Sequence, residues 1–96
     1  MSRDSLIDLI KEGNETVLKE LYQGYRDEFI LWVNKHYHLD FDTCKEVYQV
    51  SMVQFYENVL SGKLTKLTSD PKSYIFGIGK NKVREMREIA SKKFEP

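Results

Sequence analysis

The side chains of this sequence that could carry chemistry gather towards its C-terminal end. Between residues 74 and 87, basic, aromatic and amide groups recur at helical spacing. A step of about 100° per residue brings Lys80, Arg84 and Arg87 together on one side of a helix. Phe76 flanks these cations, and Asn81 and Tyr74 lie further round the helix. Phosphates need positive charge and unstacked bases need flat partners, so this pattern favours single-stranded nucleic acid. The alternative is an ordinary solvated helix face.

The opposite side of the same helix is apolar and is predicted to be buried. It consists of Ile75, Ile78, Val83, Met86, Ile89 and Ala90. Lys82 falls within this apolar arc, so it must snorkel or lie near an edge. Gly77 and Gly79 each cost a helix about 1 kcal/mol relative to alanine, which predicts a close approach of the backbone to another helix or to a ligand.

The helix before this one along the chain is also expected to have two distinct faces, and it runs from Asp42, its predicted N-cap, to about Leu60. Its predicted inward stripe is Cys44, Val47, Tyr48, Ser51, Met52, Phe55 and Val59. Its predicted outer face is Glu46, Gln49, Val50, Val53 and Glu57. Two valines among polar groups form a modest exposed apolar strip, which indicates a partner-binding face or, alternatively, a chance scatter of surface apolar residues.

Other kinds of chemistry lack the residues they need. The stretch Gly77-x-Gly79-Lys80 has neither the first glycine nor the Ser or Thr of a phosphate-binding loop, and no strand precedes it. His36 is better explained by the packed face of its helix, and His38 by the end of that helix, than by a zinc site. Cys44 lies among apolar neighbours, which indicates a small buried residue and not a nucleophile. We therefore expect no enzyme, no metal and no cofactor.

Composition and charge limit the classes of protein to consider. The 96 residues are expected to form one domain with a small core. Two prolines and five glycines argue against a turn-rich all-β fold, and the helical periodicities predict an all-α, compact bundle of about four helices. Residues 1–61 carry six Lys/Arg against eleven Asp/Glu (−5), and residues 62–96 nine against four (+5), which predicts two different surfaces. A single cysteine and no long apolar run favour a cytoplasmic protein without membrane contact.

Short breaks separate the expected helices in the first half of the chain. Ser2 to Ser5 offers capping oxygens for a first helix, which Gly13 is expected to end. Asn14 is expected to cap a longer second helix. The stretch from Phe29 to Val33 in that helix is apolar almost all round, so more than one neighbour should cover it.

The last helix follows a predicted loop. Lys63 to Ser69 has neither strong helical periodicity nor packing bulk, and we interpret it as a loop. Ser69 or Asp70 is expected to cap the next helix, with Pro71 in its first turn.

Three segments, by their order and spacing, resemble region 2 of an extracytoplasmic-function type sigma factor, the bacterial subunit that directs RNA polymerase to promoters. The run from Leu6 to Asn14, with Leu18 to Tyr22 and Tyr25-Arg26, resembles the opening helix of that family. Cys44 to Met52 resembles its acidic-V-x-Q-[D/E]-x-F segment, and Tyr74 to Asn81 resembles its aromatic-L-x-x-I-[A/G]-x-N signature. The resemblance covers nearly the whole chain and implies a sigma factor region 2 fold over residues 1–96.

The resemblance implies a domain that binds core RNA polymerase and that recognises and melts the minus-ten promoter element. Glu46 and Gln49 match positions that contact the clamp helices of the largest polymerase subunit, and Val50 and Val53 lie on the same face. The loop from Lys63 to Ser69 occupies the place where such factors capture a flipped base. The non-template single strand of promoter DNA is expected to contact Lys63, Lys66, Tyr74, Lys80, Asn81, Arg84 and Arg87. An anti-sigma factor is a further candidate partner.

Two departures from the family pattern affect these expectations. Val50 stands where the family usually has Asp or Glu, so an electrostatic contact with polymerase is missing or is replaced by an apolar contact. Residues 1–96 also lack the second, helix-turn-helix domain that reads the upstream promoter element. The alternative function is a helical protein-interaction module of the same fold with little or no DNA binding.

Overall fold

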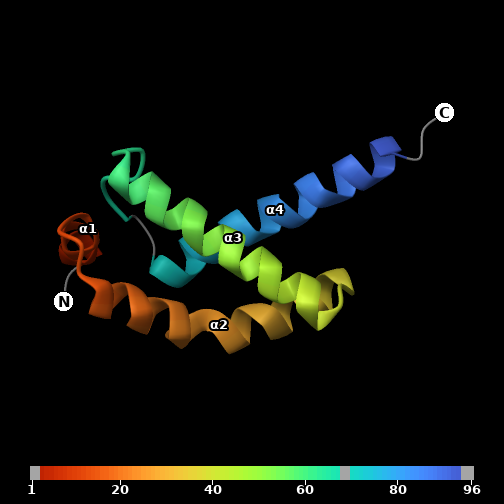
Figure 1. Cartoon of the computed structure of the whole chain (residues 1–96), viewed down its shortest axis with the longest axis horizontal. Helices are drawn as coiled ribbons and strands as arrows, with labels where there is room; N and C mark the ends of the chain where they lie inside the picture. The colour runs from red at the N-terminus through yellow and green to blue at the C-terminus, as the bar shows by residue number, and fades with distance from the viewer. Residues whose placement is uncertain (1–2, 68–69, 94–96) are drawn as a thin grey trace.

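The computed structural model describes residues 3–67 and 70–93, with side chains described for residues 6–67 and 70–90. Four helices occupy these ranges: α1 (Arg3–Lys11), α2 (Glu15–Tyr37), α3 (Phe41–Leu60) and α4 (Pro71–Lys93). No residue in the same ranges belongs to a β-strand, so the all-α prediction is confirmed. α3 crosses the middle of the bundle and packs against each of the other three helices (Figure 1).

The boundary between α1 and α2 lies where the sequence predicts it. Gly13 has a left-handed backbone, with φ +82°, and the N–H groups of Gly13 and Asn14 donate to the carbonyls of Ile10 and Leu9 at 3.0 Å. The Asn14 side chain then accepts a hydrogen bond from the N–H of Val17 at 3.0 Å. One residue therefore helps to close α1 and also caps α2.

The N-cap of α3 is Asp40, and the prediction of Asp42 is wrong. The Asp40 carboxylate accepts a hydrogen bond from the N–H of Thr43 at 2.7 Å, and its backbone is extended, as an N-cap requires. Asp42 already belongs to the first turn of the helix. Hydrogen bonds from Thr43 hold the pKa of Asp40 below its ordinary value.

Asp70 caps α4, as one of the two predicted alternatives. Its side chain accepts a hydrogen bond from the N–H of Ser73 at 2.8 Å, and Pro71 is the first helical residue. The other candidate, Ser69, and the capping oxygens expected from Ser2 to Ser5 lie outside the described side chains.

The core is built around α3, and every residue of its predicted inward stripe is buried. Tyr48 is fully buried, its hydroxyl donates to the backbone carbonyl of Tyr22 at 2.6 Å, and its ring centre lies 4.8 Å from that of Phe29. Burial raises the pKa of Tyr48 above its ordinary value. Cys44 is buried and free, as predicted, and burial likewise raises its pKa.

The loop after α3 packs more tightly than expected. Residues 61–67 form neither helix nor strand, which confirms a loop there, but Leu64 and Leu67 are both buried in the core. The N–H of Leu64 also donates to the carbonyl of Asn58 at 2.8 Å. The prediction that this stretch lacks packing bulk is therefore wrong, because two leucines three residues apart anchor the loop under the end of α3.

α2 is covered on fewer sides than expected. In the stretch from Phe29 to Val33, Leu31 is exposed, so the apolar surface is not covered all round. His36 is exposed as well, with its ring 5.8 Å from the ring of Trp32, and the prediction that it lies on the packed face is wrong.

The two glycines of α4 differ in their surroundings. A Cβ atom added to Gly79 would clash with the edge of the Phe29 ring, whereas one added to Gly77 would meet no atom within 4 Å. The predicted close approach is confirmed at Gly79, where α4 crosses α2 and α3. At Gly77 no helix approaches, because that position faces a hollow in the surface, and the approach of a ligand there stays a prediction.

The C-terminal half of α4 extends beyond the rest of the bundle (Figure 1). The whole structure, with this part of α4, measures 49 × 25 × 21 Å. Ile75 and Val83 are buried as predicted, but Met86, Ile89 and Ala90 are exposed. The prediction that the whole arc is buried is therefore wrong, because α2 and α3 cover the last turns of α4 only in part. Lys82 lies at the edge of the core with its side chain 25% exposed, as its place in the arc requires.

Across the described residues, each helix is too short or too polar to cross a bilayer.

Candidate nucleic-acid interface and docking face

The three predicted cations of α4 lie together at the seam between α4 and the end of α2. They surround a surface hollow of about 370 Å³, which we call the basic hollow. Its lining is Tyr37, Lys80, Val83, Arg84, Arg87 and Glu88. Lys80, Arg84 and Arg87 are all exposed to solvent. Three positive charges against the single carboxylate of Glu88 give the basic hollow a net positive charge.

Arg87 is held in place by the C-terminal end of α2. Its guanidinium donates to the backbone carbonyl of Tyr37 at 2.7 Å and lies 5.2 Å from the centre of the Tyr37 ring. The last carbonyls of a helix carry partial negative charge, so a cation is favoured there. Tyr37 could not be found from the spacing within α4, because tertiary packing brings it from another helix.

An aromatic wall continues from the basic hollow along the α2–α4 seam. The partly buried ring of Phe76 lies 5.0 Å from Trp32 and 5.1 Å from Phe29, measured between ring centres. Lys72 lies 5.7 Å above the Phe76 ring and pairs with Glu28 at 2.7 Å. The hydrogen bond that Lys72 donates to Glu28 raises the pKa of Lys72. We did not predict Lys72, although it lies four residues before Phe76 and on the same side of the helix.

The other predicted DNA-binding residues of α4 lie around a second hollow, between α4, α3 and the loop after α3. It measures about 590 Å³, and we call it the amide hollow. Its lining is Gln54, Asn58, Lys63, Ser73, Tyr74, Gly77, Ile78, Asn81, Lys82 and Glu85. Lys63, Tyr74 and Asn81 are thus brought together, but not with Lys80, Arg84 and Arg87. Lys66 is exposed and lines neither hollow.

A chain of amides and a hydroxyl holds Tyr74 in the amide hollow. Asn58 is buried, its side-chain nitrogen donates to the Tyr74 hydroxyl at 3.1 Å, and its side-chain oxygen accepts from Gln54 at 2.9 Å. The Tyr74 ring meets Phe55 edge to face at 5.8 Å. Asn58 and Gln54 were missed, because a polar residue in a core stripe is recognised only when its partners from the next helix are known.

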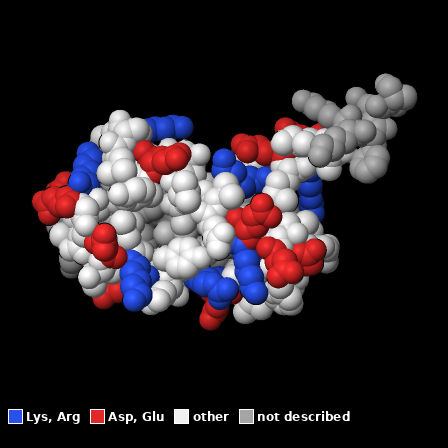
Figure 2. All heavy atoms as spheres, in the orientation of Figure 1, with Lys and Arg blue, Asp and Glu red and all other residues white. Residues whose placement is uncertain are grey.

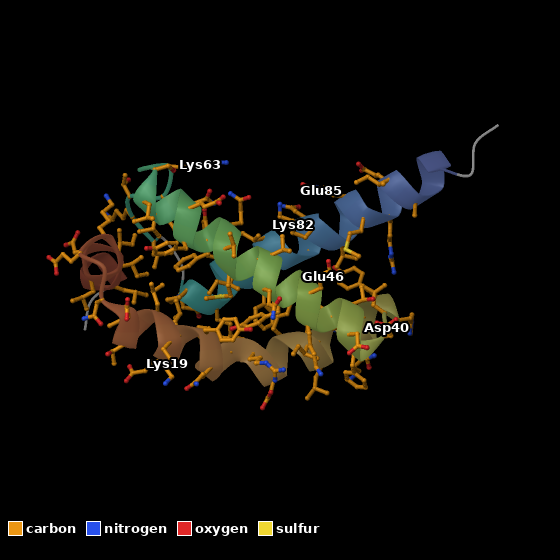
Figure 3. The ribbon with its side chains drawn as sticks, in the orientation of Figure 1. Lys19, Asp40, Glu46, Lys63, Lys82 and Glu85 are labelled. Atoms are coloured by element: carbon orange, nitrogen blue, oxygen red, sulfur yellow. The ribbon has the colours of Figure 1, made fainter. Side chains whose placement is uncertain are left out.

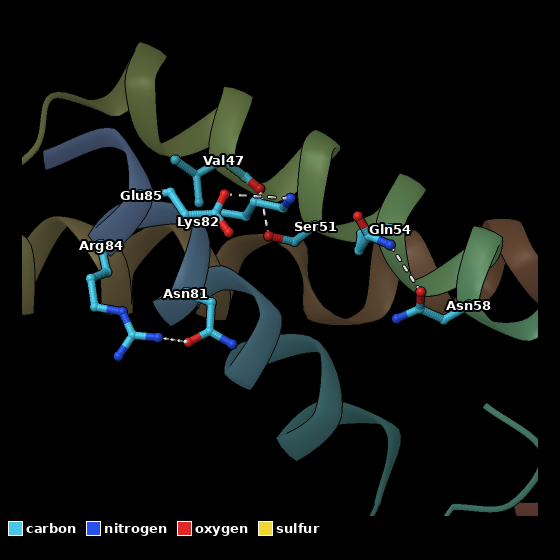
Figure 4. Close-up of polar contacts among 8 residues, drawn as sticks. All are labelled: Val47, Ser51, Gln54, Asn58, Asn81, Lys82, Arg84 and Glu85. Carbon is cyan, nitrogen blue, oxygen red and sulfur yellow. Dashed lines mark hydrogen bonds and ion pairs between the residues drawn. The ribbon is translucent and has the colours of Figure 1, made fainter. Parts of the chain in front are cut away.

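The two hollows adjoin across α4. The Arg84 guanidinium, in the basic hollow, donates to the side-chain oxygen of Asn81, in the amide hollow, at 2.9 Å (Figure 4). Lys82 pairs with Glu85 at 3.7 Å at the rim of the amide hollow, so this hollow is polar and not strongly basic. A strand held by the cations could therefore place a neighbouring base among the amides.

The predicted outer face of α3 is exposed, and the structure divides it into two parts. Val50 and Val53 are 43% and 55% exposed, and Glu46 and Gln49 are exposed as well. Glu46 and Val50 line a hollow of about 280 Å³ against α4, whereas Gln49 and Val53 line one of about 520 Å³ against the start of α2. We call these four residues the docking face. Figure 3 shows Glu46 beside Lys82 and Glu85 of α4, with Lys63 at the other end of α3.

The surface that α3 crosses carries both signs of charge. Basic and acidic side chains alternate over the side shown in Figure 2, with apolar and neutral groups between them.

Residues 6–67 and 70–90 contain no group of three His, Cys, Asp or Glu side chains that could hold a metal ion. Comparisons with protein-family models, curated proteins and solved structures gave no match for the chain.

Proposed function

We propose that this chain is a transcription-initiation domain that binds core RNA polymerase and that recognises and melts the minus-ten promoter element. In this proposal the docking face of α3 binds polymerase, and the outer side of α4 holds the non-template single strand. The polymerase carries out all nucleotide chemistry. The family resemblance of the sequence suggests the proposal, and the geometry of α4 supports it.

The observation that carries the proposal is the basic hollow with its aromatic wall. Lys80, Arg84 and Arg87 are solvent-exposed, the Tyr37 ring lies beside Arg87, and the rings of Trp32 and Phe76 follow along the seam. Phosphates can meet the cations while unstacked bases meet the rings, the combination that single-strand binding proteins use. The basic hollow shares no lining residue with the hollows along α3, so phosphates at the cations and the polymerase would not compete for one surface. The amide hollow shares Lys82 and Glu85 with the hollow that Glu46 and Val50 line.

The amide hollow supplies a place for a base removed from the duplex. Flipping a base costs a few kcal/mol of stacking and pairing, which a fitted pocket can offset. Asn81 and Gln54 present donors and acceptors that could pair with a base edge, and Tyr74 presents a ring. In this proposal the cations supply affinity, and the amide hollow supplies preference for the minus-ten sequence.

Binding of a labelled single strand, measured by fluorescence anisotropy at about 50 and about 200 mM salt, tests the DNA half of the proposal. Arg84→Ala combined with Arg87→Ala should weaken binding and should reduce the salt slope by about 0.7 for each phosphate that is no longer neutralised. Lys11→Ala combined with Lys19→Ala is the matched control, because it removes two exposed charges that line neither the basic hollow nor the amide hollow. An equal loss in the control pair, or no salt-dependent binding by the wild type, would refute the proposed interface.

Sequence preference is measured separately with a minus-ten-like strand and a scrambled strand. Asn81→Ala should reduce the ratio of the two affinities and leave the salt slope nearly unchanged, because an amide that reads a base edge contacts no phosphate. If the ratio stays the same, the amide hollow does not read the sequence.

Capture of core RNA polymerase by the immobilised chain tests the other half. Gln49→Ala should lower the captured amount, whereas Gln23→Ala, an exposed glutamine of α2, should not. Polymerase capture without any DNA binding would favour the alternative function, a helical protein-interaction module.

A further inference from the structure

Three exposed apolar side chains meet where the end of α4 passes α3. Met86 and Ile89 are 39% and 57% exposed and, with Val50 of α3, line the hollow of about 280 Å³. The buried side chain of Val47 closes its floor. Single exposed apolar residues are ordinary, but several that share one hollow between two helices mark a binding surface.

The structure of α4 explains why this surface is left open. Met86 and Ile89 continue the arc that is buried at Ile75 and Val83, but α3 covers them only in part, so both side chains stay exposed beside Val50. The helix therefore keeps an amphipathic pattern past the end of its own core. An apolar stripe of this kind is suited to a partner that covers it.

The charges at the rim of the hollow define the chemistry of that partner. Glu46 and Glu85 contribute two negative charges, and Lys82 contributes one positive charge that Glu85 already pairs at 3.7 Å. Among the described residues no hydrogen bond or ion pair engages Glu46. A partner with an apolar helix edge flanked by a basic side chain would fill the hollow and also neutralise Glu46.

We infer that the polymerase-docking surface continues from α3 onto the end of α4, with Met86 and Ile89 as additional apolar anchors for an amphipathic helix that carries a basic flank. This inference rests on the proposed function, because it assigns the helix to core RNA polymerase. It also gives a role to Val50, which departs from the sigma-factor pattern. Val50 belongs to an apolar contact, and an acidic side chain at this position would be unfavourable.

Affinity for core RNA polymerase, measured by anisotropy of the labelled chain, tests the inference. Met86→Ala combined with Ile89→Ala should weaken binding by about ten- to thirtyfold, because the few side chains that fill a pocket of the partner account for most of the affinity of an interface. Leu31→Ala combined with Leu60→Ala is the matched control and should change the affinity by less than about twofold. These two leucines are 60% and 50% exposed and lie outside the hollow. All four side chains are already exposed, so neither pair should unfold the chain.

Two substitutions distinguish an apolar contact from an electrostatic one. Val50→Glu should weaken polymerase binding about tenfold, because it places a charge at a position where the complex would bury an apolar side chain. Tighter binding by this variant would overturn the inference. Glu46→Lys should also weaken binding, and more strongly at low salt, because it places a positive charge opposite the basic flank of the partner.

The outcomes separate the inference from the function on which it rests. If Gln49→Ala weakens polymerase binding and the Met86 and Ile89 pair does not, the proposed function stands and the inference is overturned. If the wild type does not bind polymerase, both are overturned. Sedimentation equilibrium of the chain alone tests the remaining candidate occupant of the hollow, a second copy of this chain. Self-association that is abolished by the Met86 and Ile89 pair, with polymerase affinity unchanged, would assign the hollow to a second copy of this chain and overturn the inference.

Discussion

Alanine at Gly79 should destabilise the protein, whereas alanine at Gly77, on the same helix, should stabilise it. Each substitution removes a helical glycine and so gains about 1 kcal/mol of intrinsic helix stability. At Gly79 the new Cβ atom would clash with the edge of the Phe29 ring, which is fully buried. That ring cannot withdraw easily, because Tyr48 and Phe76 lie 4.8 and 5.1 Å away between ring centres.

The magnitude follows from the balance of these two effects. Overpacking a well-filled core costs about 1–3 kcal/mol, and a ring enclosed on several sides places Gly79→Ala at the upper end, for a net loss of about 2 kcal/mol. Gly77→Ala meets no atom within 4 Å and should keep its gain of about 1 kcal/mol. For a domain of this size, the melting temperature should fall by about 10 °C in the first variant and rise by about 5 °C in the second.

Both changes in stability are measured by thermal and urea unfolding, with the helical circular-dichroism signal as the readout. Gly24→Ala is a second control, because it also lies in a helix and a Cβ atom there would meet nothing within 4 Å. A Gly79→Ala variant as stable as the wild type, or more stable, would refute the reasoning. It would mean that Phe29 can move at little cost and that the crossing of α4 over α2 does not require a glycine.

Other substitutions test the caps, the buried hydroxyl and the amide hollow. Asp40→Ala should lower the melting temperature more than Asp42→Ala, and lowering the pH through the depressed pKa of Asp40 should abolish the difference. Tyr48 has a raised pKa in the folded state, so the unfolded chain releases its proton first, and stability should fall above about pH 10 in pH-dependent unfolding. Asn58→Ala should cost about 1–2 kcal/mol in urea unfolding and less in a Tyr74→Phe background, because the hydrogen bond between the two side chains is then already absent.

Local signals in the sequence were sufficient to predict most of the helix boundaries. Gly13 with Asn14, and Asp70 with Pro71, satisfy backbone groups only a few residues away, so no tertiary information is needed. The α3 cap shows the limit of this reasoning. Asp40 and Asp42 are both reasonable caps by type, and only the backbone conformation at the start of the helix decides between them.

Burial was predictable only where a neighbouring helix is present. The periodicity of α4 describes which face the helix offers to a core, but it does not say how far the core extends, so Met86 and Ile89 were assigned wrongly. In the loop the error was the opposite one, because Leu64 and Leu67 were not expected to pack in the core. They are buried by residues of the helices that lie far away in the sequence. For His36 the residue type and spacing were compatible with both outcomes.

The candidate site was predictable to the extent that it lies on one helix. Lys80, Arg84 and Arg87 come together because helical geometry alone places them on one side. The contribution of Tyr37 and the division into two hollows depend on how α2, α3 and the loop pack against α4. No pattern within a single segment contains that information.

The aromatic wall places the one tryptophan of the chain where it can report on binding without an added label. The Trp32 ring lies 5.0 Å from Phe76 and 5.7 Å from Tyr37, next to the basic hollow and away from the docking face. A strand that stacks at this seam should quench or shift its emission, whereas a protein bound only along α3 should leave the emission nearly constant. Occupancy of the two surfaces can therefore be followed separately in one titration of the unmodified protein.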